Sequence, residues 1–195
     1  MKVHNGIAVR SGRLLDLFDE HPTHEAELIA AIERHVRFGD SVVVVGGGYG
    51  VATVRAAHRV GRDGDVVAFE ASEEYYSLLG ETVDLNRLSD RVETRHAVVG
   101  EARDVYDGMG DADVVSPSDL PECDVLVMDC EGAEEVILDG LEIEPETIIV
   151  ESHAPLDAPP ERVRELLSDR GYTIVNESGV SSADGGVVVH TAVRE

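Results

Sequence analysis

Hydrophobic positions fall into short runs of β-branched residues separated by longer stretches with one apolar face. Such runs are typical of strands in a parallel sheet, which is covered on both faces and loses the polar alternation of an exposed strand. We expect strands at 42–45, 66–69, 92–99, 125–128 and 147–150. We expect helices at 52–59, 72–88, 133–138 and 159–170. Strands alternating with helices predict a single α/β domain, with a mostly parallel sheet and helices on both faces.

The two ends of the chain follow other patterns. Residues 24–38 form an apolar stripe at helical spacing after Thr23, which could cap that helix, so residues 1–40 are expected to form a helical cap on a domain of residues 41–195. At the other end, 172–175 and 186–193 can pair as antiparallel strands. The acidic, glycine-rich stretch 100–121 is expected to be a loop with a short extended piece at Val114 and Val115.

A glycine-rich loop directly follows the first buried strand. Gly46, Gly48 and Gly50 lie where the chain must turn sharply and let a ligand approach the backbone. The next strand ends in Glu70, whose carboxylate could accept hydrogen bonds from a ribose diol. These features predict a site for an adenosine-containing cofactor, because helix N-termini and the carboxyl ends of strands meet at this edge.

The spacing of the glycines narrows the choice of cofactor. A dinucleotide fingerprint G-x-G-x-x-G/A would require a small residue at Val51 or Thr53. The run Gly46-x-Gly48-x-Gly50 instead resembles the loop of class I S-adenosylmethionine-dependent methyltransferases. That resemblance implies a Rossmann-like methyltransferase fold with S-adenosyl-L-methionine as cofactor.

A second motif makes the resemblance more specific. Asp129-Cys130-Glu131-Gly132-Ala133-Glu134 resembles the D-x-E-G-x-E signature of the FkbM-type methyltransferases, and 150–153 resembles the later V-E-x-H segment of that family. The resemblance covers residues 41–153 and implies O-methylation of a hydroxyl on a small molecule or sugar. Two positions depart from the family pattern: Val44 replaces an acid that helps to hold the methionine ammonium, and Val127 replaces a frequent lysine.

From this resemblance we expect the three loop glycines, Glu70, Ala71 and Val98 to bind the cofactor, with Val98 or Ala97 near the adenine. Asp129, Glu131 and His153 are the expected catalytic residues, as bases or as groups that orient the acceptor. Three of these residues also have a structural alternative. Glu70 could be a solvated carboxylate at a strand end, and Asp129 or Glu131 could cap the following helix.

A metal is a further alternative at the same edge of the sheet. Asp129, Glu131, Glu151 and His153 could together ligate a hard divalent cation. We predict that the site holds no metal.

The charge balance suggests the setting in which the protein works. The chain has 40 acidic and 16 basic residues, a net charge of −24, and Lys2 is its only lysine. Regular hydrophobic runs argue against disorder, so this composition resembles that of proteins from salt-loving archaea, whose solvent screens the self-repulsion. We therefore expect no nucleic-acid partner, since no basic patch could neutralise phosphates.

Cysteine content and hydropathy predict a reduced, cytoplasmic protein with no membrane association. Cys123 and Cys130 bracket one extended strand, about 23 Å apart, which is too far for a disulfide within that strand. No stretch of the sequence resembles a signal peptide or a membrane span.

Two other classes of function compete with the methyltransferase. A nicotinamide-dependent oxidoreductase would share the sheet, but it is disfavoured by the glycine spacing and by the lack of a Tyr-x-x-x-Lys pair. A non-catalytic cofactor-binding or scaffold domain remains open because of Val44 and Val127. The methyltransferase is the leading hypothesis.

Overall fold

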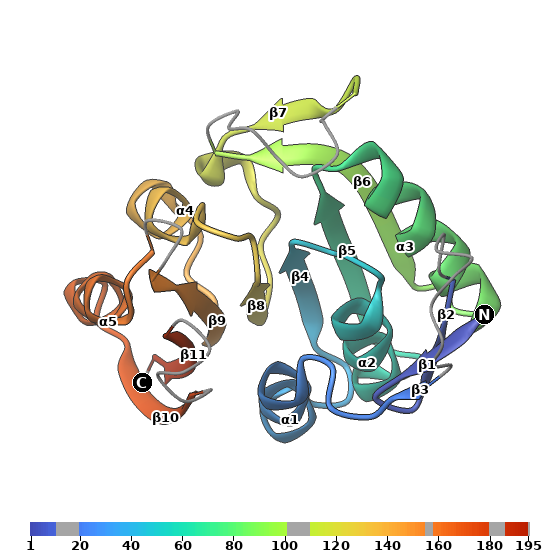
Figure 1. Ribbon diagram of the computed structural model, residues 1–195. Helices are drawn as coiled ribbons and strands as arrows, with labels where there is room; N and C mark the ends of the chain where they lie inside the picture. The colour runs from blue at the N-terminus through green and yellow to red at the C-terminus, as the bar shows by residue number, and fades with distance from the viewer. Residues whose placement is uncertain (11–19, 101–109, 155–157, 180–185, 195) are drawn as a thin grey trace.

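The computed structural model describes residues 1–10, 20–100, 110–154, 158–179 and 186–194. A sheet of eight strands forms the centre of the molecule (Figure 1), in the order β10-β11-β9-β8-β4-β5-β6-β7. These strands are β4 (Ser41–Val45), β5 (Asp65–Glu70), β6 (Val92–Val99), β7 (Asp113–Val115), β8 (Val125–Met128), β9 (Thr147–His153), β10 (Thr173–Gly179) and β11 (Val187–Val193). Strand β11 pairs antiparallel with both of its neighbours, β9 and β10, and the other pairings in this sheet are parallel. The predicted parallel sheet with an antiparallel finish is therefore confirmed.

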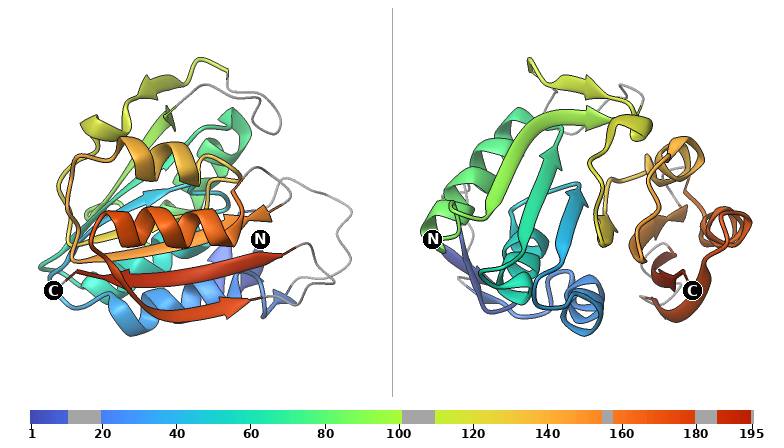
Figure 2. Two further views of the ribbon diagram at one scale, coloured as in Figure 1. Left: turned by 90° about the vertical axis from the view of Figure 1, so that its left-hand side faces the viewer. Right: turned by 180° about the vertical axis from the view of Figure 1, so that it is seen from behind.

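Helices cover both faces of this sheet (Figures 1 and 2), as the alternation of the sequence predicts. They are α1 (Ala26–His35), α2 (Val51–Val60), α3 (Glu73–Leu85), α4 (Glu134–Gly140) and α5 (Pro160–Asp169), with a 3₁₀ turn, η1 (Pro117–Asp119). Apolar residues of α1, α2 and α3 form one buried cluster with one face of the strands. Residues of α4 and α5 form a second cluster on the other face. The alternating side chains of β4 divide between them, with Val44 in the first and Val45 in the second.

The N-terminal segment differs from the expected helical cap. It contains a small sheet of β1 (Lys2–His4), β2 (Ile7–Val9) and β3 (Glu20–His21), in the order β2-β1-β3. The sequence does not predict these strands, because two or three residues are too few to show alternation. The helix was predicted, but it shares a hydrophobic cluster with the central sheet and is therefore part of the domain core.

Several element boundaries also differ from the predictions. Helix α1 begins two residues later than expected, with Glu25 rather than Thr23 at its N-cap. Ser72 does cap α3, since its hydroxyl accepts a hydrogen bond from the backbone N–H of Tyr75. Strand β9 continues three residues beyond Val150, because β11 pairs with it as far as His153.

A buried polar chain joins the antiparallel strands to the sheet. The Ser152 hydroxyl donates to the carbonyl of Val188 (3.0 Å) and lies 3.0 Å from Nε2 of His190. Nδ1 of His190 lies 2.7 Å from the Glu177 carboxylate. These contacts connect Ser152, His190 and Glu177 as in a hydrolytic triad. Ser152 and His190 are completely buried, however, so no substrate can reach them. This series of hydrogen bonds pairs polar groups within the core.

Within the residues described, no helix is long and apolar enough to cross a membrane.

Candidate functional site

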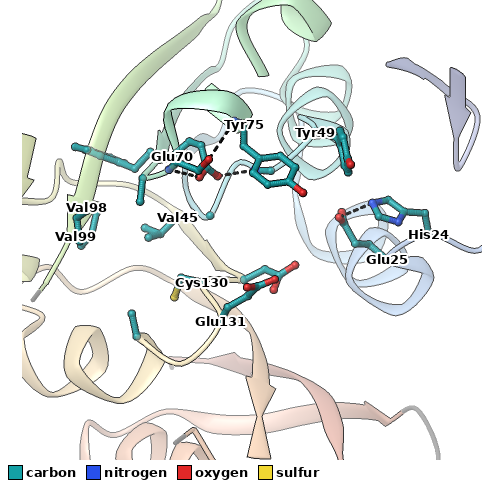
Figure 3. A pocket seen from close by; sticks show the side chains of 18 residues that line it. His24, Glu25, Val45, Tyr49, Glu70, Tyr75, Val98, Val99, Cys130 and Glu131 are labelled. Carbon is teal, nitrogen blue, oxygen red and sulfur yellow. Dashed lines mark hydrogen bonds and ion pairs between the residues drawn. The ribbon is translucent and has the colours of Figure 1, made fainter. Parts of the chain in front are cut away.

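A pocket of about 280 Å³ opens at the carboxyl ends of β4, β5, β6 and β8 (Figure 3). This is the edge at which open α/β sheets bind ligands. Most of the residues expected at a site line the pocket: Gly46, Gly48, Glu70, Ala71, Ala97, Val98, Asp129 and Glu131. Of the other expected residues, Gly50 and His153 do not line it.

The three loop glycines differ in what a side chain would meet at each position. A Cβ on Gly46 would lie 1.8 Å from the backbone oxygen of Asp129, so β8 ends directly against this residue. A Cβ on Gly50, the N-cap of α2, would lie 3.1 Å from a methyl group of Thr82. A Cβ on Gly48 would meet nothing within 4 Å. Packing therefore accounts for Gly46 and Gly50, whereas Gly48 presents open backbone to the pocket.

Glu70 is a fixed part of the site. One carboxylate oxygen accepts the N–H of Gly48 at 2.7 Å, and the other accepts the N–H of Ser72 at 2.8 Å (Figure 3). The residue is buried, with 8% of its surface exposed. This excludes the alternative of a solvated strand-end carboxylate. Each oxygen retains a further lone pair for a ligand hydroxyl.

One end of the pocket is apolar. Val45, Val98 and Val99 lie together there (Figure 3). The neighbouring Cys130 adds no charge, because burial raises the pKa of its thiol well above the ordinary value. This end suits a flat, apolar group.

A polar network lies where β8 and β9 end. His153 Nδ1 lies 2.9 Å from the completely buried carboxylate of Glu134, and its Nε2 lies 3.4 Å from Asp129 and 3.5 Å from Glu151. Glu134 also accepts the backbone N–H groups of Cys130 and Gly132. His153 therefore lies beside Asp129 and behind the pocket wall.

The network explains how the D-x-E-G-x-E segment is held. The N-cap of α4 is Ala133, which makes no side-chain capping hydrogen bond, so neither Asp129 nor Glu131 is the N-cap of that helix. Glu131 has a left-handed backbone (φ 50°), and Gly132 follows with φ 107°. A non-glycine residue in this conformation costs on the order of 1 kcal/mol and is enriched at functional sites. The turn presents Glu131 at the pocket (Figure 3).

Burial and neighbouring charges shift the proton affinities of the network. Burial raises the pKa of Asp129 well above its ordinary value, and the carboxylates of Glu151 and Glu25 add to the rise. Burial by itself would lower the pKa of His153, but its contacts with Glu134, Glu151 and Asp129 raise it to about 10. His153 is therefore an imidazolium at neutral pH, compensating the carboxylates around it.

The same side chains have the chemistry of a cation site. One ligand atom each of Asp129, Glu151 and His153 lies within 4.8 Å of the others. Two carboxylates and an imidazole suit a divalent ion. The two carboxylates can equally be compensated by the positive charge of protonated His153. The absence of a metal stays a prediction.

One wall of the pocket consists of residues that the sequence motifs do not mark. His24, Glu25, Tyr49 and Tyr75 line it, and the first two come from the N-terminal segment. The Nε2 atom of His24 lies 2.8 Å from a carboxylate oxygen of Glu25 (Figure 3). No motif marks this pair, which reaches the site only because α1 packs beside β9 and α2.

The two departures from the family pattern are core positions. Val44 and Val127 are buried, with at most 1% of their surface exposed, in the cluster that includes α1 and α2. Neither side chain lines the pocket. Strand β4 therefore supplies no polar side chain to the site.

Comparison with known proteins supports the fold. No protein-family model and no curated protein matches the sequence. A precorrin-6y methyltransferase from Geobacter metallireducens matches with a TM-score of 0.62 at 16% identity, over 96% of this chain and 94% of its own. A putative transferase from Pyrococcus horikoshii matches with a TM-score of 0.63 at 19% identity, over 99% of this chain and 71% of its own.

A third structure, a putative tRNA methyltransferase from Streptococcus pneumoniae in complex with S-adenosyl-L-methionine, matches with a TM-score of 0.60 at 17% identity. The match covers 86% of this chain and 72% of that one. At such identities the likeness establishes the fold. The chain has the Rossmann-like α/β fold of these methyltransferases, as the sequence predicts.

Proposed function

We propose that this protein is an S-adenosyl-L-methionine-dependent methyltransferase. The observation that carries the proposal is Glu70, a buried carboxylate held by the N–H groups of Gly48 and Ser72 at the wall of the pocket. A carboxylate fixed in this way at the end of the second parallel strand suits the two hydroxyls of a ribose.

The remainder of the pocket fits the rest of the cofactor. The apolar end at Val98 and Ala97 suits an adenine ring, with Ala71 next to the ribose. The backbone at Gly48 is open to the chain that joins the ribose to the sulfonium. Gly46 and Gly50 contribute indirectly by shaping the loop.

Asp129, Glu131 and His153 are the proposed catalytic group. Methyl transfer from a sulfonium depends mainly on in-line positioning of the acceptor, so the demands on side chains are modest. A carboxylate with a raised pKa, such as Asp129, is better matched to accept a hydroxyl proton near neutral pH. His153 carries the positive charge between Asp129 and Glu151, so the proposal requires no metal.

The proposed acceptor is a hydroxyl on a small molecule or sugar, as the FkbM resemblance implies. Two similar structures are described as a putative tRNA methyltransferase and a tRNA methyltransferase, which makes tRNA the competing acceptor. A net charge of −24 opposes binding to a polyanion. Transfer of a labelled methyl group to tRNA, but not to polyols or sugars, would reverse the assignment of the acceptor; Asp129→Asn is the inactive control.

Calorimetric titration with S-adenosylmethionine, S-adenosylhomocysteine and NAD, in molar potassium chloride, tests the proposal. We expect the two sulfur nucleosides to bind and NAD not to bind. Binding of NAD alone would support an oxidoreductase. Binding of none of the three would contradict a cofactor site in this pocket. Cofactor binding without transfer to any acceptor would favour the scaffold domain.

A further inference from the structure

The pocket has a charged end opposite its apolar end. In Figure 3, Val98 and Val99 lie on one side and the His24–Glu25 pair on the other, with Glu70 and Tyr75 between them. The pair comes from the turn that leads into α1, a segment outside the motifs discussed above.

We propose that Glu25 binds the ammonium group of the amino-acid part of the cofactor, and that His24 positions Glu25 for this role. The inference rests on the proposed function and adds a residue that recognises the cofactor. The ligand class is an adenosyl group that carries a primary ammonium, as opposed to a nucleotide that carries phosphates.

The backbone at Glu25 is the first argument. Its φ of 50° and ψ of 34° place it in the left-handed region, which costs a non-glycine residue on the order of 1 kcal/mol. It occupies the N-cap of α1, yet its side chain makes no capping hydrogen bond. The side chain points instead into the pocket (Figure 3). Local helix formation does not account for this arrangement, whereas a ligand contact would.

The contacts and exposure of the Glu25 carboxylate also fit a ligand-binding role. One oxygen of Glu25 lies 2.8 Å from Nε2 of His24, and a carboxylate has further lone pairs that can accept hydrogen bonds. The side chain of Glu25 is 22% exposed and lines the pocket, so the carboxylate can receive a ligand. A carboxylate accepts the N–H of an ammonium in a short, charge-assisted bond.

The charge of the facing wall is the third argument. Asp129 and Glu131 line the same pocket from the turn after β8. Glu25 adds to the rise in the pKa of Asp129, so the two carboxyl groups interact electrostatically. Three carboxyl groups around one space favour a cationic group and repel a pyrophosphate. The negative charge of these carboxyl groups disfavours dinucleotides, and this argument is independent of the glycine spacing.

The surroundings of His24 support its positioning role. Its ring packs edge-on against His4 (centroids 4.5 Å apart) and near Tyr49 (6.1 Å). Contact with Glu25 raises the pKa of His24 against the effect of burial. Burial and the neighbouring His24 and His21 lower the pKa of His4 to about 4, so His4 is neutral and does not repel its neighbour.

Two ligands that differ only at the end in question provide the test. S-adenosylhomocysteine carries the amino-acid group, and 5′-methylthioadenosine lacks it. In calorimetric titrations we expect Glu25→Gln to weaken binding of S-adenosylhomocysteine about 10-fold or more and to leave binding of 5′-methylthioadenosine unchanged. Glu27→Gln, an exposed position on the first turn of α1, is the control for loss of one charge and should match the wild type for both ligands.

Each other result has a definite meaning. Unchanged binding of S-adenosylhomocysteine by Glu25→Gln would overturn the inference and leave the proposed function standing. Equal weakening of both ligands would indicate a role in folding and would also overturn it. A wild-type protein that binds neither ligand would overturn the proposed function and the inference together. If Glu25→Gln does not fold, Glu25→Asn, which tolerates the left-handed backbone, takes its place with the same expectations.

Discussion

Gly46 and Gly48 stand two positions apart in one loop, yet their neighbourhoods predict different sensitivities to substitution. Gly46→Ala would force a Cβ against the backbone oxygen of Asp129, which cannot move without shifting β8. We expect a loss of about 3 kcal/mol or more in the free energy of unfolding. Gly48→Ala meets open space and should cost only about 1 kcal/mol of backbone strain.

Urea denaturation of both variants measures this difference. Similar losses of stability for Gly46→Ala and Gly48→Ala would contradict the close contact between β8 and the loop. The two variants serve as controls for each other, because both residues have positive φ (88° and 50°).

Glu70 connects the loop to the ligand in our proposal. Glu70→Gln should weaken binding of S-adenosylhomocysteine by about 1–3 kcal/mol, since a charge-assisted acceptor for the ribose is lost. Calorimetry measures the affinity, and Glu74→Gln, exposed in the first turn of α3, is the matched control. An unchanged affinity would remove Glu70 from the cofactor site.

At the scale of elements, His153 links the end of β9 to α4 through Glu134. The pKa of His153 rises from 6.5 to about 10 on folding, so the folded state binds its proton more tightly than the unfolded chain. The resulting stabilisation is complete below pH 6.5 and is lost as the pH rises through about 10. Its size is on the order of a few kcal/mol.

We therefore expect the melting temperature of the wild type to fall as the pH rises from 7 toward about 10. His153→Gln should flatten that slope and be less stable at neutral pH. His58→Gln, on an exposed part of α2, should keep the wild-type slope and is the control. Parallel slopes for wild type and His153→Gln would show that His153 does not hold this proton.

The surface charge acts at the scale of the whole molecule. With 40 acidic against 16 basic residues, 24 carboxylates lack a possible Lys or Arg partner. Their mutual repulsion is screened over about 10 Å at 0.1 M salt and over shorter distances in molar salt. We expect the melting temperature to rise by roughly 10 °C between low and molar potassium chloride.

Scanning calorimetry across a potassium chloride series tests that expectation. Sucrose at matched osmolality is the control, since it is excluded from protein surfaces but does not screen charge. A melting temperature that does not respond to the salt, or that falls with it, would contradict the salt-adapted interpretation of the composition.

Local patterns were sufficient for much of the sheet and for part of the site. The run 42–45 and the residues of β8 are continuous apolar stretches, which predict strands that are buried on both faces of a parallel sheet. Glu70 and Asp129 were identifiable because each directly follows or ends such a strand. In a parallel sheet, strand ends of this kind meet at one edge.

Contacts between segments far apart in the chain decided the rest. Position 46 requires glycine because of the backbone of Asp129, and the ring of His153 is held by the carboxylate of Glu134. In both cases the contacting residue is far away in the sequence. Glu25 lines the pocket only because α1 packs against the same core as β4. The sequence by itself thus determined the order and type of the main elements, since hydrophobic period is a local property. Only the tertiary structure decided which polar side chains share the pocket, because that depends on how the elements pack.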